Sequence, residues 1–108
     1  MPLYLYQGAY GAEGWSALVE KPQNRIQAVR PAVESLGGKI HNAFFSFGEY
    51  DVALIVELPD NVSMAALSMA IAAGGAIKSA KTTVLLSPED ALAAMKKAST
   101  SGYKAPGK

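Results

Sequence analysis

The stretch FGEYD at residues 47–51, followed by VALIVELPD at residues 52–60, decides the fold of this chain. The Gly48-Glu49 pair suits a two-residue type II′ turn, because glycine accepts the positive φ that this turn requires. The second stretch is almost uniformly apolar before its final Pro-Asp, as is typical of a buried strand. We therefore predict a β-hairpin with strands at residues 39–47 and 50–58.

The segment after the hairpin has the signals of a helix. Pro59 ends the strand, because proline cannot donate to a ladder, and Asp60 or Asn61 can cap a helix at residues 62–73. That helix is almost entirely Ala, Met, Leu, Ile and Val. A helix that is apolar all round is expected to be buried on more than one side.

The segment before the hairpin predicts a strand at residues 3–10 and a helix from about Trp15, which Pro22 punctuates. The second part of the helix carries apolar residues at helical spacing, namely Ile26, Val29, Val33 and Leu36. Pro31 interrupts this pattern and predicts a kink or a break, since its ring clashes with the preceding turn.

A strand at residues 79–86 and a helix capped by Ser87 complete the pattern. The order is β-α-β-β-α-β plus a C-terminal helix, which predicts a ferredoxin-like α+β sandwich with two helices on one sheet face. We expect one domain over residues 1–98 and a flexible tail over residues 99–108.

The predicted hairpin assigns residues to the two faces of the sheet. Its register pairs Phe45 with Val52, Ala43 with Leu54 and His41 with Val56. This face would carry the helices, and Leu3 and Leu5 would join it. The opposite face would show Tyr4, Tyr6, Asn42, Phe44, Ser46, Asp51, Ala53, Ile55 and Glu57. Such a face is too apolar to stay bare, so a second sheet in a homodimer or higher oligomer is expected.

The composition narrows the class of protein. Ten basic against nine acidic residues, with half of the chain hydrophobic, indicates a globular domain without a nucleic-acid or membrane surface. There is no cysteine and one histidine, so no metal site within one chain and no cofactor is expected. No signal peptide is evident, and a cytoplasmic location is predicted.

Few residues are candidates for chemistry. His41 is a candidate general base, or a strand-end histidine without a function. Asp51 is a candidate proton acceptor or ligand contact, or a residue that bonds turn amides. Tyr4, Tyr6, Phe44 and Trp15 would line an apolar pocket or an oligomer interface.

The motif Gly48-x-Tyr50-Asp51 resembles the signature of the GYD domain family, small bacterial and archaeal proteins without an established biochemical role. The resemblance covers about residues 3–86. It extends to Leu36-Gly37-Gly38, Val56-Glu57-x-Pro59-Asp60 and Lys81-Thr82-Thr83, whereas Pro31, Val84 and Leu86 depart from it. The family resembles the dimeric α/β barrel group, whose members include cofactor-free monooxygenases, isomerases and ligand-sensing domains. The resemblance to the GYD family implies that Tyr50 and Asp51 are candidate ligand contacts.

Two hypotheses follow. One is a small-molecule binding domain of the dimeric α/β barrel type, with catalysis without a cofactor as an open extension. Its ligand contacts would be Tyr4, Tyr6, Phe44, Tyr50 and Asp51. The alternative is a non-catalytic oligomerisation or regulatory module that binds itself.

Overall fold

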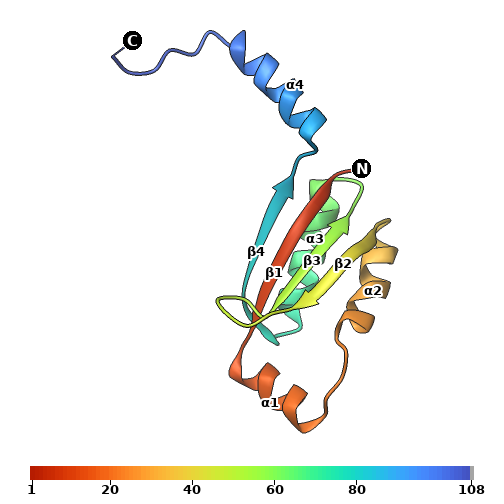
Figure 1. Ribbon diagram of the computed structural model, residues 1–108. Coiled ribbons are helices and arrows are strands. Elements are labelled where there is room, and N and C mark those ends of the chain that lie inside the picture. The colour runs from red at the N-terminus through yellow and green to blue at the C-terminus, as the bar shows by residue number, and fades with distance from the viewer. Residues whose placement is uncertain (108) are drawn as a thin grey trace.

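The computed structural model describes residues 1–107, which form one four-stranded sheet and four helices. In chain order the elements are β1 (Leu3–Tyr10), α1 (Ala12–Glu20), α2 (Ile26–Ser35), β2 (Lys39–Phe45), β3 (Val52–Glu57), α3 (Asn61–Ala73), β4 (Ile77–Leu85) and α4 (Pro88–Ser99). The strands are antiparallel in the order β2-β3-β1-β4. Helices α2 and α3 cover one sheet face, while α4 leads away from the end of β4 (Figure 1). This is the predicted ferredoxin-like α+β fold.

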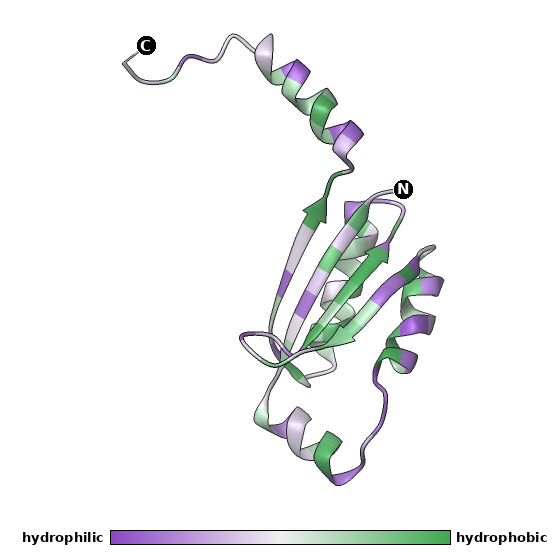
Figure 2. Ribbon diagram, viewed as in Figure 1, coloured by the Kyte–Doolittle hydropathy of each residue, from purple (hydrophilic) through white to green (hydrophobic). Residues whose placement is uncertain are grey.

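The core lies between the sheet and helices α2 and α3. Val52, Leu54 and Val56 of β3 are buried there, as predicted, and β3 is hydrophobic along most of its length (Figure 2). The other members of the core cluster are Tyr4, Tyr6, Ile26, Val33, Leu58, Met64 and Leu67. The opposite face of the sheet has no helix over it in the described chain (Figure 1).

Strand β1 presents the opposite face from the one predicted. Tyr4 and Tyr6 pair with buried residues of β3, and their exposed fractions are only 1% and 2%. The placement of Leu3 and Leu5 under the helices was therefore wrong, and these leucines lie on the helix-free face. Both alternating sets in this strand are apolar, so its sequence favours neither face.

Strand β2 contains a bulge that the sequence did not reveal. The predicted pairs Phe45–Val52 and Ala43–Leu54 are confirmed. The register then shifts between Ile40 and Asn42, so that Ile40, not His41, pairs with Val56. The extra residue turns the His41 side chain away from its predicted place.

The connection between β2 and β3 is longer than the predicted two-residue turn. It spans residues 46–51, and the Ser46 amide donates to the Asp51 carbonyl at 2.8 Å. Gly48 is not among the glycines with positive φ, so the type II′ turn is wrong. The Asp51 amide donates to the Gly8 carbonyl at 2.8 Å, so the residue that closes this connection is also bonded to β1.

The helix boundaries follow the caps more closely than the prolines. Asp60 caps α3 by accepting the Ser63 amide, and Ser87 caps α4 by accepting the Asp90 amide, as predicted. Helix α2 continues through Pro31, so no break occurs there. The proline is exposed.

Helix α3 is buried on one side only within the described chain, and its burial on a second side stays a prediction. Met64 and Leu67 are buried, whereas Val62 and Met69 are 78% and 70% exposed. The sheet covers one face of the helix, and no further layer of residues 1–107 covers the other.

Helix α4 stands apart from the domain. No residue of α4 is buried, and Leu92 and Met95 are exposed. The radius of gyration is 17.4 Å, compared with roughly 13 Å for a compact domain of about 100 residues. No helix of the described chain is long and apolar enough to cross a bilayer. Lys108, the end of the predicted tail, lies outside the described residues.

Candidate functional site

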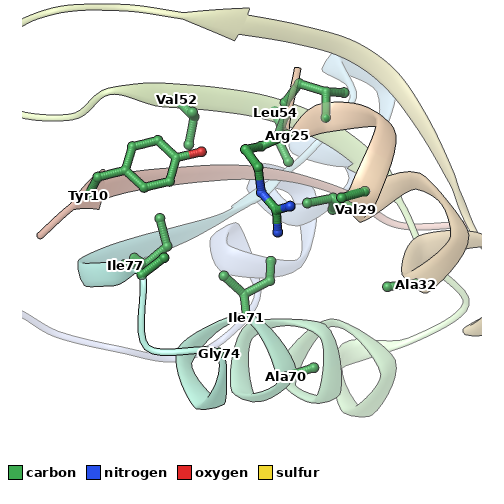
Figure 3. Close-up of a pocket in the computed structure, with 13 residues that line it drawn as sticks. Tyr10, Arg25, Val29, Ala32, Val52, Leu54, Ala70, Ile71, Gly74 and Ile77 are labelled. Carbon is green, nitrogen blue, oxygen red and sulfur yellow. The ribbon is translucent and has the colours of Figure 1, made fainter. Parts of the chain in front are cut away.

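A cavity of about 240 Å³ opens between α2, α3 and the helix-covered face of the sheet (Figure 3). It is lined by Tyr10, Arg25, Ile26, Ala28, Val29, Ala32, Val52, Leu54, Ala70, Ile71, Gly74, Ala76 and Ile77. Small residues occupy part of this lining, namely Ala28 and Ala32 of α2, Ala70 of α3 and Gly74 just after α3, and their short side chains leave space unfilled. An apolar cavity of about 150 Å³ already accommodates benzene. This cavity therefore has room for a ring and several further atoms.

Two polar groups stand on this apolar lining. The Tyr10 hydroxyl and the Arg25 guanidinium both point into the opening between the helices and the sheet (Figure 3). Burial raises the pKa of Tyr10, while the positive charge of Arg25 acts in the opposite direction and the negative charge of Asp51 raises it further. The Tyr10 phenol is therefore a neutral hydrogen-bond donor at physiological pH.

The ring of Tyr10 is held from behind by Trp15 of α1. The two ring centroids are 5.2 Å apart in an edge-to-face arrangement. Such pairs favour one orientation of both rings. Helix α1 thus fixes the direction of the Tyr10 side chain, which is 8% exposed.

Asp51 supports this arrangement without lining the cavity. Its Oδ2 accepts the Tyr10 amide at 2.9 Å, while its own amide donates to the Gly8 carbonyl. Both bonds join the start of β3 to the end of β1. The neighbouring Tyr50 is half-buried, and its carbonyl accepts the Ser46 hydroxyl at 2.8 Å. The structure thus gives Asp51 a positioning contact, with an amide of β1 in place of the expected turn amides.

The other predicted ligand contacts do not come together. Tyr4 and Tyr6 lie under the helices, where burial raises the pKa of both. The Tyr4 hydroxyl donates to Asn61 Oδ1 at 2.6 Å. Phe44 lies on the helix-free face, as predicted, and is 61% exposed. A sheet separates it from the two tyrosines, so these three residues cannot line one pocket of a single chain.

A second hollow of about 310 Å³ lies between α3 and the edge strand β4. Its lining consists of Tyr4, Asn61, Met64, Ala65, Ser68, Thr82 and Val84. None of these side chains is charged, and the bond to Asn61 already occupies the Tyr4 hydroxyl. This hollow offers less for recognition than the cavity at Tyr10.

His41 forms a pair with Glu57, not with a cavity. Its Nε2 lies 2.9 Å from Glu57 Oε1, and both side chains are partly exposed. The hydrogen bond from His41 holds the pKa of Glu57 below its usual value. Within residues 1–107 no group of three or more His, Cys, Asp or Glu side chains could hold a metal ion.

The residues that sequence reasoning missed are Tyr10 and Arg25. One ends a strand and the other immediately precedes a helix, at Ile26. Their only sequence signal was this position at the ends of elements, which many surface residues share.

The comparisons with known proteins concern family and fold. The family model of the GYD domain matches residues 4–95. FFRP-DM1 is 16% identical with a TM-score of 0.53, over 80% of this chain and 100% of its own. TTHA0845 from Thermus thermophilus is 16% identical with a TM-score of 0.53, over 81% and 95%. The hypothetical protein PHS023 from Pyrococcus horikoshii is 15% identical with a TM-score of 0.51, over 81% and 92%. No curated protein matches the chain.

Proposed function

The chain belongs to the GYD domain family, and we propose that it binds a small molecule in the cavity between α2, α3 and the sheet. The observation that carries this proposal is the unfilled, mainly apolar space of about 240 Å³ with two polar groups at its opening. Ligand sites combine an apolar lining with a few placed polar groups in this way. The lining contains no His, Asp or Glu, which favours binding over acid–base catalysis. A cytoplasmic location and a bacterial source are part of the same proposal.

The first test fills the cavity. Ala70 lines it on α3, whereas Ala73 is an exposed alanine of the same helix outside the lining. Ala70→Phe is expected to weaken binding of small aromatic compounds at least tenfold, because the new ring occupies their space. Ala73→Phe carries the same helix-propensity change and should bind as the unmodified chain does. Binding is measured by NMR shifts of the Ile71 and Ile77 methyl groups.

Two experimental outcomes would contradict the proposed binding of a small molecule in this cavity. A panel of small aromatic and aliphatic acids, amides and alcohols that leaves these methyl signals unmoved would remove the small-molecule function. Equal affinity in the two alanine variants would place any binding outside the cavity.

A second candidate function, self-assembly, is favoured by two uncovered apolar surfaces. The helix-free sheet face carries Leu3, Leu5, Phe44, Ala53, Ile55 and Leu85. Helix α4 carries a stripe formed by Ala91, Leu92, Met95 and Ala98. An isolated helix of this length is marginal in water without packing. We propose that a second copy of this chain covers both surfaces, because near-neutral apolar faces suit each other and offer no charge cluster to another partner.

Solution mass tests this assembly. The full chain is expected to be a dimer or larger by light scattering. Leu92→Glu combined with Met95→Glu should shift it toward monomer, because two charges would enter the packed stripe. Ala93→Glu combined with Lys97→Gln, on the other side of α4, changes the net charge by the same amount and is the matched control, which should leave the mass unchanged. A monomeric unmodified chain at high concentration would refute assembly.

A further inference from the structure

We infer that the ligand of the Tyr10–Arg25 cavity is a small carboxylic acid with an apolar body, bound by its carboxylate to Arg25 and Tyr10. This inference deepens the proposed function and rests on it. It follows from the charge, the unused hydrogen-bonding groups and the size of the cavity.

The charge of the lining has one sign. Arg25 is its only charged residue. The only ion pair in residues 1–107 joins His41 to Glu57, so no carboxylate neutralises Arg25 there. The guanidinium donates to the neutral Gln23 Oε1 at 3.2 Å. Arginine binds a carboxylate by donating two parallel N–H bonds, and the Arg25 guanidinium is available for this because no carboxylate of residues 1–107 pairs with it.

The acid whose charge acts on Tyr10 is already engaged. The Asp51 carboxylate accepts the Tyr10 amide at 2.9 Å and does not line the cavity. It fixes the strand that carries Tyr10 without cancelling the charge of Arg25 at the opening.

The Tyr10 hydroxyl supplies a second, independent observation. Its side chain is buried, with only 8% exposed, and its hydroxyl points into the cavity, as Figure 3 shows. None of the hydrogen bonds among residues 1–107 uses this hydroxyl. No buried side-chain oxygen among residues 1–107 lacks a hydrogen-bond partner, so this hydroxyl reaches the opening of the cavity, where its donor is available. A ligand oxygen in the cavity would accept from it, beside the cation that a carboxylate also needs.

The remaining lining determines the body of the ligand. Apart from Tyr10 and Arg25 the lining is entirely apolar or glycine, so only an apolar group replaces water there without losing hydrogen bonds. The volume of about 240 Å³ suits a single ring or a short branched chain. Amines are disfavoured, because they would meet Arg25 as a like charge.

The test compares 3-phenylpropanoate with 3-phenylpropanamide, which have nearly the same shape and differ in charge. On the full chain the acid is expected to bind at least tenfold more tightly, by NMR titration of the Ile71 and Ile77 methyl groups. Arg25→Gln should weaken the acid about tenfold and leave the amide unchanged. Arg30→Gln, at an arginine within α2 and outside the lining, is the matched control. Tyr10→Phe removes only the hydroxyl and should weaken the acid several-fold.

The outcomes separate this inference from the proposed function. Equal affinity for acid and amide, with both moving the cavity methyl groups, would overturn the carboxylate inference and leave the binding cavity standing. Equal weakening by Arg25→Gln and Arg30→Gln would also overturn it, because binding would then follow the overall charge of α2. If neither compound moves the methyl signals, both the inference and the site fail. Circular dichroism of each variant establishes that the fold is retained.

Discussion

Gly38→Ala is expected to lower the free energy of unfolding by about 3 kcal/mol. Gly38 precedes β2 where the chain passes against the end of β3. A Cβ atom there would overlap the Glu57 carbonyl oxygen and lie 2.6 Å from Leu58 Cδ2. The first of these atoms belongs to backbone paired within the sheet, since Glu57 pairs with both Lys39 and Leu3. Relief of the overlap would therefore require strands to move apart.

The matched control is Gly48→Ala, in the connection between β2 and β3. A Cβ at Gly48 meets no heavy atom within 4 Å, and its φ is not positive. Urea denaturation is expected to show a change within about 0.5 kcal/mol for this variant. Similar losses at both glycines would show that the effect of Gly38→Ala does not come from the close approach to β3.

The fold was largely predictable because the decisive signals are local. The apolar run of β3 and the caps Asp60 and Ser87 each act within a few residues. They gave the order of elements, and the motif Gly48-x-Tyr50-Asp51 gave the family.

The errors in the sheet arose from pairing. Strand β1 alternates leucines with tyrosines, so both faces are apolar and only its pairing with β3 decides which one is buried. The bulge at His41 depends on how β2 and β3 meet and has no signature in the letters. A shift of one residue exchanges the two faces of a strand.

The candidate site could not be predicted from the sequence for a related reason. Its lining comes from β1, α2, β3, α3 and the start of β4, which are far apart along the chain. Tyr10 and Arg25 acquire their roles only where these elements meet. The motif residue Asp51 was identifiable, but its bond to the Tyr10 amide was not, because that bond crosses 41 positions of sequence.

Asp51→Ala is expected to destabilise the fold by about 2 kcal/mol, since it leaves a partly buried amide without its acceptor. The bond it removes joins Asp51 Oδ2 to the Tyr10 amide at 2.9 Å. Asp51→Asn retains an oxygen acceptor at that place and should lose much less. Glu49→Ala, in the same exposed connection, is the control and should be nearly neutral. Urea denaturation of the three variants measures each loss.

The same variants decide between the two roles considered for Asp51. If Asp51 is a positioning residue, the Asp51→Asn variant should fold and bind 3-phenylpropanoate as the unmodified chain does, because the Asp51 side chain does not line the cavity. A direct ligand contact would instead lose affinity in Asp51→Asn with stability intact. Stability lost in Asp51→Ala, together with unchanged binding in Asp51→Asn, would mean that the Asp of the GYD motif holds β1 to β3 and acts on the cavity only through Tyr10.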